Sequence, residues 1–502
     1  MRGNQRTSGE LSRKEGGKIF GSGSRTPIAI TILVKKPNST GTANIFYHDI
    51  GDYLTREDKL RIIKEFGSIC NPEMHLSSIT PNEDNDWLNQ RDGLFSTFVP
   101  IGDKDDKDCK TIFTQWYSCG AQTNRDSWVY NFSREQLEIN SSRMVQTYNS
   151  QVDEFSREQV KNPQIKPEDF VIKDETKIKW SSSLLPQLTR KVKGVYSGEK
   201  IVEAMYRPFC KQFLYFDRLF IHRPYQIPKL FPTPQTKNLV ICVPGIGAKK
   251  GVSALMVDCI PDVQLQYNGQ CFPLHYYEQI DQQSVSLFDF GEDDFTRRDG
   301  ISDFALSHAR EIYGPKINKE DVFYYIYGLL HSSDYRARFE NDLTKMLPRI
   351  PFFEDVKLFR AYLNAGRKLA ELHVNYENAK PWADAIVTGD MSCLNIEKMR
   401  FAKAGGEDDK RTIIINPRLK VENIPLLAYD YVINGKSALE WVMERYSYSV
   451  HPESKITNNP NAWGEEHGDP QYIVNLLLRI ITVSVETIKI TSTLPPLTFP
   501  EH

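Results

Sequence analysis

Residues 206–226, YRPFCKQFLYFDRLFIHRPYQ, decide the interpretation of this sequence because they combine a strand pattern with a dense run of cations, amides and aromatic rings. From Trp180 onward, short apolar and aromatic runs are broken by Pro and Gly, which is typical of short β-strands. The runs lie at 213–216, 238–243, 252–257 and 271–277. This part of the chain therefore predicts a β-rich unit.

The same stretch lies in a strongly basic part of a chain that is neutral on average. The whole sequence has 63 basic and 65 acidic residues and a net charge of −2, which in itself does not favour a nucleic-acid partner. Residues 178–251 hold thirteen basic residues against three acidic ones, a local excess of ten positive charges. Lys and Arg neutralise phosphates, and Arg and Gln also pair with guanine and adenine edges. The pattern indicates polyanion binding about as strongly as it indicates a solvated basic face.

Downstream of the β-rich unit the pattern becomes helical. Apolar residues at helical spacing predict helices at 322–329, 358–372 and 473–481. Ser437 and Glu440 form a capping-box signature for a further helix.

Upstream, the chain mixes short elements. The apolar, β-branched run at 24–34 predicts a buried strand, and 45–47 predicts a second strand. Residues 56–66 predict an amphipathic helix. The Asp-rich stretch 103–108 predicts a loop, and the polar stretch 151–175, which contains two prolines, predicts a linker.

Length and composition argue for a cytoplasmic protein of several domains. A chain of 502 residues is long enough for roughly two to four domains. The first twenty residues contain no apolar stretch, and no window approaches the ~20 apolar residues that span a bilayer. The eight cysteines have no CxxC spacing and no His at zinc-ligand spacing, which indicates reduced thiols.

Two motifs resemble ligand sites but lack their defining residues. Residues 243–251, VPGIGAKKG, follow a strand, yet the Lys pair is followed by Gly instead of Ser or Thr. A β-hairpin turn is therefore favoured over a phosphate cradle. The acidic cluster 292–294 has no His or further carboxylate at useful spacing, so we expect a solvated loop. No GxSxG, HExxH or Cys-His signature is present, so we expect no catalytic residue, metal or cofactor in this chain.

Several stretches resemble a known family. Residues 122–128 (QTNRDSW), 206–209 (YRPF), 231–234 (FPTP) and 270–274 (QCFPL) are similar to the C-terminal region of type ISP restriction-modification enzymes, including their C-terminal specificity domain. Residues 20–30 (FGSGSRTPIAI) resemble the late strand of an adenine-N6 DNA methyltransferase domain. The resemblance continues into 437–445 and 469–496 and covers nearly the whole chain.

The resemblance implies DNA recognition without complete catalytic machinery. Enzymes of this family join a nuclease, a helicase-like ATPase, a methyltransferase and a target-recognition domain in one polypeptide. Their S-adenosylmethionine loop and Asn-Pro-Pro-Tyr tetrad lie upstream of the strand that here contains Ile28, so both are absent from this sequence. We therefore expect S-adenosylmethionine in the full-length family enzyme and not in this chain.

These observations define a fold and two functions. We expect a mixed α/β fold with four parts: a methyltransferase remnant (1–37), a methyltransferase-associated spacer (38–177), a β-rich target-recognition unit (178–318) and a helical C-terminal bundle (319–502). The first function is sequence-specific recognition of double-stranded DNA. The alternative is a subunit that reconstitutes S-adenosylmethionine-dependent adenine-N6 DNA methylation, or restriction, with a separate catalytic chain. A decayed fragment without activity is a third possibility.

Ten side chains are candidates for the DNA interface. Expected phosphate contacts are Lys191, Lys193, Lys211, Lys249 and Lys250, and expected base contacts are Arg207, Gln212, Arg218, Arg223 and Gln226. Two alternatives stay open: Arg207 can hold the turn at Pro208, and Arg218 can pair with the neighbouring Asp217.

Overall fold

The computed structural model divides into two compact units, Met1–Gly93 and Leu94–His502, and the boundary falls within the short helix α3 (Gly93–Thr97). The described residues are 3–4, 9–20, 25–35, 37, 41, 43–248, 251–280 and 295–500. The mixed α/β prediction is confirmed, since helices and several sheets alternate along the chain.

The first unit contains few regular elements. These are the helices α1 (Gly9–Glu15) and α2 (Arg56–Phe66) and the antiparallel strands β1 (Ile45–Tyr47) and β2 (Ser77–Ile79). Helix α2 has the predicted bounds because Thr55 and Asp58 form a capping box at its start. The buried ammonium of Lys59 donates to the carbonyls of Glu15 and Gly17 at 2.6 and 2.8 Å, which ties α2 to the segment after α1.

The predicted buried strand at 24–34 is wrong. Residues 25–34, the part of that stretch that is described, form no strand, and Leu33 and Val34 are 86% and 78% exposed. β-branched residues favour a strand only where a neighbouring strand and a covering layer are available. In this unit the described strands β1 and β2 pair with each other.

Two four-stranded sheets form the β-rich centre of the second unit. Their strand orders are β10-β6-β7-β5 and β4-β11-β8-β9. The strands are β4 (Ser118–Cys119), β5 (Tyr130–Asn131), β6 (Ile201–Arg207), β7 (Cys210–Tyr215), β8 (Val240–Val243), β9 (Leu255–Val257), β10 (Ile260–Pro261) and β11 (Gln270–Pro273). Each of the four predicted strand runs overlaps one of these strands.

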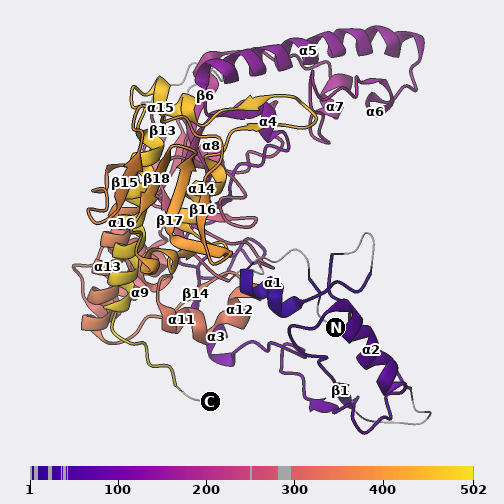
Figure 1. Ribbon diagram of the computed structural model, residues 1–502, viewed down its shortest axis with the longest axis vertical. Coiled ribbons are helices and arrows are strands. Elements are labelled where there is room, and N and C mark those ends of the chain that lie inside the picture. The colour runs from indigo at the N-terminus through magenta and orange to yellow at the C-terminus, as the bar shows by residue number, and fades with distance from the viewer. Residues whose placement is uncertain are drawn as a thin grey trace. The chain divides into compact units, whose positions relative to one another are not determined.

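Helix α5 (Arg134–Lys161) extends from the strands as one continuous helix (Figure 1), so the linker predicted at 151–175 is wrong over its first part. The buried face of α5 continues through Val152 and Phe155. Gln151 is also buried, and its polar group is satisfied, since its side-chain oxygen accepts a hydrogen bond from the backbone N–H of Ile172 at 2.9 Å. The polar composition of this stretch therefore did not indicate the helix. The buried side-chain amide of Gln151 binds the segment that follows α5 at Ile172. Short helices α6 (Pro167–Phe170) and α7 (Leu185–Thr189) follow it.

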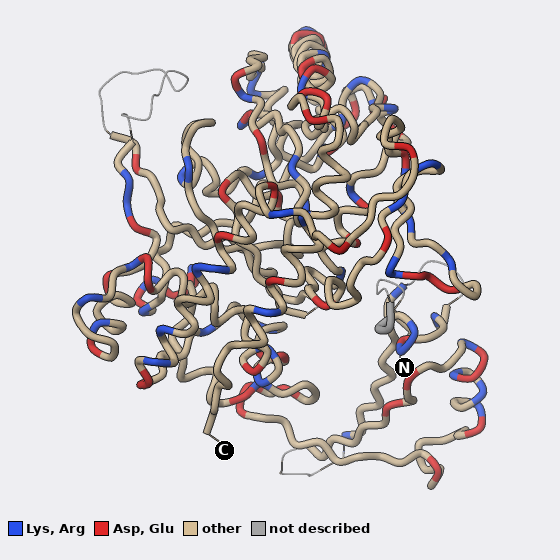
Figure 2. Tube along the Cα trace, turned by 60° about the vertical axis from the view of Figure 1, so that its left-hand side comes forward, with Lys and Arg blue, Asp and Glu red and all other residues tan. Residues whose placement is uncertain are grey.

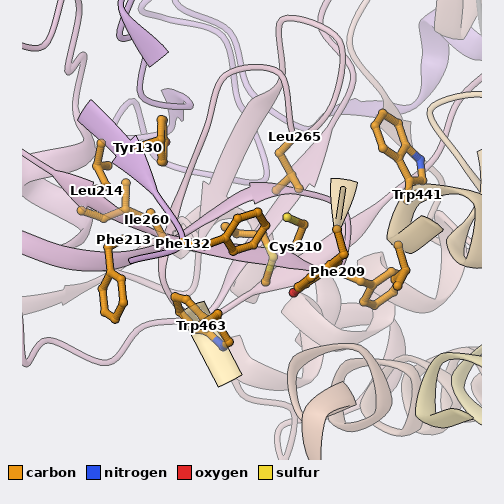
Figure 3. Packing of buried hydrophobic residues seen from close by; sticks show 14 of the residues in the cluster. Tyr130, Phe132, Phe209, Cys210, Phe213, Leu214, Ile260, Leu265, Trp441 and Trp463 are labelled. Atoms are coloured by element: carbon orange, nitrogen blue, oxygen red, sulfur yellow. The ribbon is translucent and has the colours of Figure 1, made fainter. Parts of the chain in front are cut away.

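A large aromatic core joins the first of these sheets to the C-terminal helices (Figure 3). Phe213 on β7 packs against Trp463, with ring centroids 4.8 Å apart, and Phe132 packs against Tyr446 at 5.2 Å. Truncation of one such buried aromatic side chain to Ala costs about 3–5 kcal/mol. The core elements from the C-terminal part are α14 (Ala438–Arg445), α15 (Asn461–Glu466) and α16 (Tyr472–Ser492).

The predicted helices of the C-terminal part are confirmed. They correspond to α10 (Lys319–Leu329), α13 (Val356–Val374), α14 and α16, and α14 begins with the predicted capping box. Helices α10 and α13 cross at two glycines, since a Cβ on Gly366 would lie 1.8 Å from the carbonyl oxygen of Tyr324. Only a residue without a side chain permits so close a crossing.

The C-terminal part also contains a four-stranded antiparallel sheet that the sequence did not predict. Its order is β15-β18-β17-β16, formed by β15 (Ile386–Gly389), β16 (Arg400–Ala404), β17 (Glu407–Asn416) and β18 (Leu419–Glu422). The remaining elements of the unit that the argument uses are α4 (Asp126–Val129), α8 (Ile227–Leu230), β21 (Ser449–Val450) and β22 (Thr457–Asn458).

The glycine-rich stretch 243–251 lies between two antiparallel strands, as the hairpin favoured from the sequence requires. Strands β8 and β9 on either side of it are antiparallel, with Val240 opposite Val257 and Cys242 opposite Leu255. Lys249 and Lys250, both predicted phosphate contacts, lie outside the described residues, and so does the acidic cluster 292–294.

Candidate nucleic-acid interface

Much of the basic run at 178–251 is neutralised in the structure. Five of its cations form ion pairs, and most of their partners come from outside the run. The pairs are Lys179–Glu175 at 3.2 Å, Lys193–Asp153 at 2.8 Å, Lys200–Asp217 at 2.6 Å, Arg207–Asp262 at 2.8 Å and Lys211–Glu377 at 2.6 Å. Figure 2 shows basic and acidic residues interleaved along the trace. The local charge excess therefore overstates the charge available to a polyanion.

Arg207 lies in a buried polar cluster. One guanidinium nitrogen donates to the Asp262 carboxylate at 2.8 Å, and the guanidinium carbon lies 3.9 Å from the centre of the Tyr206 ring. The Arg207 side chain is 13% exposed and that of Asp262 only 3%. Burial raises the pKa of Asp262 to about 7, against the opposing effect of the guanidinium. These contacts favour a structural role for Arg207 over base contact.

Lys211 and Gln212 also face the interior. Burial in itself lowers the pKa of Lys211, yet the Glu377 carboxylate holds it above its ordinary value, so the ion pair is charged. Gln212 is 2% exposed, and its side-chain oxygen accepts a hydrogen bond from Asn458 at 3.4 Å. Both side chains connect the sheet to C-terminal segments.

Three candidate cations, Lys191, Arg218 and Arg223, remain at the surface without a carboxylate at ion-pair distance among the described residues. Arg190, which was not a candidate from the sequence, shares these properties, and all four side chains are exposed. Asp217 pairs with Lys200, so it is not the partner of Arg218. Lys193 is more than half exposed, and its partner Asp153 is equally exposed. A solvated pair of this kind contributes little and leaves the lysine available to a phosphate.

The surface cations sit on segments that contact one another. The loop that carries Arg190 and Lys191 packs on α5, because the Tyr148 hydroxyl donates to the carbonyl of Val192 at 2.8 Å. The same loop meets the segment after β7, since a Cβ on Gly194 would lie 2.8 Å from the Phe220 ring. The Phe220 carbonyl accepts a hydrogen bond from buried Arg125 at 2.7 Å. Arg218 and Arg223 lie two and three positions from Phe220, so the segments that carry the exposed cations are neighbours. We call these four residues (Arg190, Lys191, Arg218, Arg223) the cationic rim.

Arg223 and Gln226 lie at the end of the cationic rim. The backbone N–H and C=O of Arg223 pair with those of Gln122 at 2.9 and 3.0 Å, which forms an isolated antiparallel bridge. Gln226 is half-buried at the start of α8, and its backbone N–H donates to Ser118 at 3.0 Å. Sequence reasoning did not identify Gln122 or Asn124 as site residues, because only the long-range bridge brings them beside Arg223.

A cavity opens beside this bridge. Its volume is about 480 Å³, and the hairpin β21–β22 forms one wall. Asn131 on β5 holds the hairpin by donating to the Thr457 carbonyl at 2.9 Å, and the Phe132 N–H donates to Asn458 at 3.0 Å. The polar lining residues include Asn124, Asp126, Lys179, Tyr206, Gln212, His451 and Asn458. Asn124, two positions after Gln122, thus lines a polar hollow that Gln122 and Arg223 do not themselves line.

The described residues offer no cation site and no membrane span. None of them form a group of three or more His, Cys, Asp or Glu side chains that could hold a metal ion. Within the same part of the chain, no helix is both long and apolar enough to cross a membrane.

The α/β unit that carries the cationic rim is also the part of the chain in which a protein family is matched. The family model of the Type ISP C-terminal specificity domain matches residues 111–476. The chain belongs to this family.

Three solved structures are similar over almost the whole chain. A nuclease-deletion mutant of the Type ISP restriction-modification enzyme LlaGI, in complex with a DNA substrate mimic, is 39% identical over 98% of this chain with a TM-score of 0.83. The ATP-dependent Type ISP enzyme LlaBIII bound to DNA is 32% identical over 99%, with a TM-score of 0.86. A DrdV–DNA complex is 26% identical over 99%, with a TM-score of 0.83.

The chain spans only part of these larger proteins. It covers 36% of the LlaGI chain, 30% of the LlaBIII chain and 47% of the DrdV chain. No match was found among the curated proteins.

Proposed function

We propose that this chain recognises a specific sequence in double-stranded DNA as the specificity module of a restriction-modification enzyme. The observation that carries the proposal is the match of residues 111–476 to a specificity-domain family. Arg190, Lys191 and Arg218 of the cationic rim supply unpaired charge for phosphates, and the Gln122–Arg223 bridge supplies an amide and a guanidinium suited to base edges.

The candidate residues divide into three roles. We assign phosphate contact to Arg190, Lys191, Lys193 and Arg218, and retain Lys249 and Lys250 in that role from the sequence. We assign base contact to Arg223 and Gln226. We assign a structural role to Arg207, Lys211 and Gln212, because their polar groups bind other residues of the chain.

A salt titration with a randomised DNA pool tests this proposal. The full chain is incubated with random duplexes at increasing salt, and the bound fraction is sequenced. Sequence recognition predicts enrichment of one short site. Binding that falls with salt but enriches no site contradicts recognition and leaves only a basic surface.

We further propose that the complete protein acts as an adenine-N6 DNA methyltransferase or restriction enzyme in the cytoplasm, with S-adenosylmethionine bound to a methyltransferase part. The exposed apolar side chains Ile30, Ile32, Leu33 and Val34, 57–86% exposed, favour this proposal because a run of this kind is normally covered by protein. Methylation of DNA by the chain together with a methyltransferase part, and by neither alone, is the expected result. A chain that never associates with such a part contradicts it.

A further inference from the structure

Two loops far apart in the sequence are locked together where the cationic rim ends. Besides the Gln122–Arg223 bridge, Ala121 forms a parallel bridge with Asp262, with hydrogen bonds of 2.8 and 3.0 Å on its two sides. Arg125, 1% exposed, donates to the Phe220 carbonyl at 2.7 Å and to the Ser181 hydroxyl at 2.6 Å. The loop that carries Gln122 is thus fixed on both sides before any ligand binds.

The side chain of Gln122 is held by two neighbours. The Tyr225 hydroxyl donates to its amide oxygen at 3.1 Å, and its amide nitrogen donates to the Asn124 side-chain oxygen at 3.1 Å. A Gln amide has two acceptor sites on its oxygen and two N–H donors. One of each is used within the chain, so one acceptor and one donor remain. That is the number that bidentate pairing with adenine requires.

The backbone φ is positive at both neighbours, which Asn tolerates and which strains Tyr225. Asn124 has φ +53° and Tyr225 has φ +49°. A bulky residue such as Tyr rarely adopts a positive φ, and strain of this kind persists mainly where the surroundings enforce it at functional sites. The unusual backbone turns the Tyr225 hydroxyl toward the Gln122 amide. Asn124 and Tyr225 are both exposed, so the network lies at the surface.

Arg223 lies opposite Gln122 in the bridge. The bridge places Gln122 and Arg223 directly opposite each other, and side chains of opposed residues stand on the same face with their Cβ atoms about 5 Å apart. No carboxylate of the described residues pairs with Arg223, which is exposed. An unpaired guanidinium keeps all its donors available for the O6 and N7 acceptors of guanine.

We propose that the Gln122–Arg223 bridge is a preformed base reader, in which Arg223 pairs with a guanine and Gln122 pairs with an adenine close to it. Tyr225 is a positioning residue that holds the Gln122 amide. The proposal rests on the proposed function of DNA recognition and adds the bases that are read. Two opposed side chains with Cβ atoms about 5 Å apart can reach base pairs that are stacked about 3.4 Å apart in the same duplex.

Sequencing of the bound fraction from a randomised duplex pool tests the proposal with the full chain and four variants. Arg223→Lys keeps the positive charge but removes the two-donor edge of the guanidinium. The preference for guanine over the other bases at one position should therefore fall by roughly 5- to 150-fold. Gln122→Ala should relax an adenine at a second, nearby position. Tyr225→Phe should relax that same position by a smaller factor. The matched control, Arg190→Ala on the cationic rim, should weaken binding to all sequences and change no position.

The outcomes separate this proposal from the function on which it rests. An unaltered chain that enriches no site overturns both. An enriched site that survives Arg223→Lys and Gln122→Ala unchanged overturns the base reader and leaves DNA recognition standing. A Tyr225→Phe variant that relaxes a position different from Gln122→Ala removes Tyr225 from the positioning role. Thermal melting of each variant accompanies the binding data, and equal melting is expected because all the altered side chains are partly or fully solvent-exposed.

Discussion

Replacement of Arg207 by Ala should lower the free energy of unfolding without changing the DNA sequence that the protein selects. The change removes a guanidinium that donates to Asp262 at 2.8 Å and leaves behind a carboxyl group that is 3% exposed. Loss of one partner from a buried ion pair costs about 3–5 kcal/mol, because the remaining charge has no compensation. We expect the free energy of unfolding to fall by that amount near pH 8.

The loss should depend on pH in a defined direction. Asp262 has a pKa of about 7 in the folded chain, above its ordinary value, and without Arg207 this pKa rises further. A carboxyl group with a raised pKa destabilises the fold as pH rises from its unfolded pKa near 4 through its folded pKa. Arg207→Ala should therefore be less destabilising at pH 5 than at pH 8.

Urea unfolding followed by tryptophan fluorescence measures this change in the second unit, which holds six of the seven tryptophans. The double variant Arg207→Met with Asp262→Leu is the control, since it removes both charges and should recover most of the lost stability. A single variant with stability unchanged within about 0.5 kcal/mol, but with a lost base preference, would refute the structural role and restore Arg207 as a base reader.

Three further predictions follow from single sites. Gly366→Ala should cost about 1–3 kcal/mol in urea unfolding by overpacking, because its Cβ meets a backbone carbonyl of α10 at 1.8 Å, whereas Gly198→Ala, with its closest contact at 3.7 Å, should be nearly neutral. Burial lowers the pKa of His373 to about 3, so its contribution to the free energy of unfolding, roughly 4–5 kcal/mol at most, is present above pH 6.5 and lost as pH falls toward 3. Unfolding at several pH values should show this loss, and His373→Gln should flatten it. Arg190→Ala combined with Lys191→Ala should reduce the slope of log affinity against log salt by about 0.9 per lost phosphate contact, and an unchanged slope removes both residues from the interface.

Local patterns in the sequence predicted local structure well. The helix at 56–66 was predicted from its amphipathic spacing and the start of α14 from its capping box, and both patterns involve residues that are near one another along the chain. The hairpin at 243–251 follows from its glycines and from the strands on either side. In each case the residues that determine the structure lie within a few positions of one another, so no knowledge of the fold was required.

Long-range contacts explain where prediction stopped. Lys211 and Glu377 are separated by 166 positions, so the sequence could not show that this cation is neutralised. The last part of α5 was predicted as a linker because the stretch from Gln151 is polar, whereas Gln151 is buried and bonded to the backbone of Ile172. The bridge between Gln122 and Arg223 is of the same kind. Charge counting located the region of the candidate site, and only the fold separated paired from unpaired cations within it.

The central claim is that this chain selects a DNA sequence, and enrichment from a randomised duplex pool at near-physiological salt measures that most directly. The account predicts one short enriched site, with affinity that falls as salt rises. Equal binding to all duplexes at every salt concentration, or no binding by a folded chain, would contradict it.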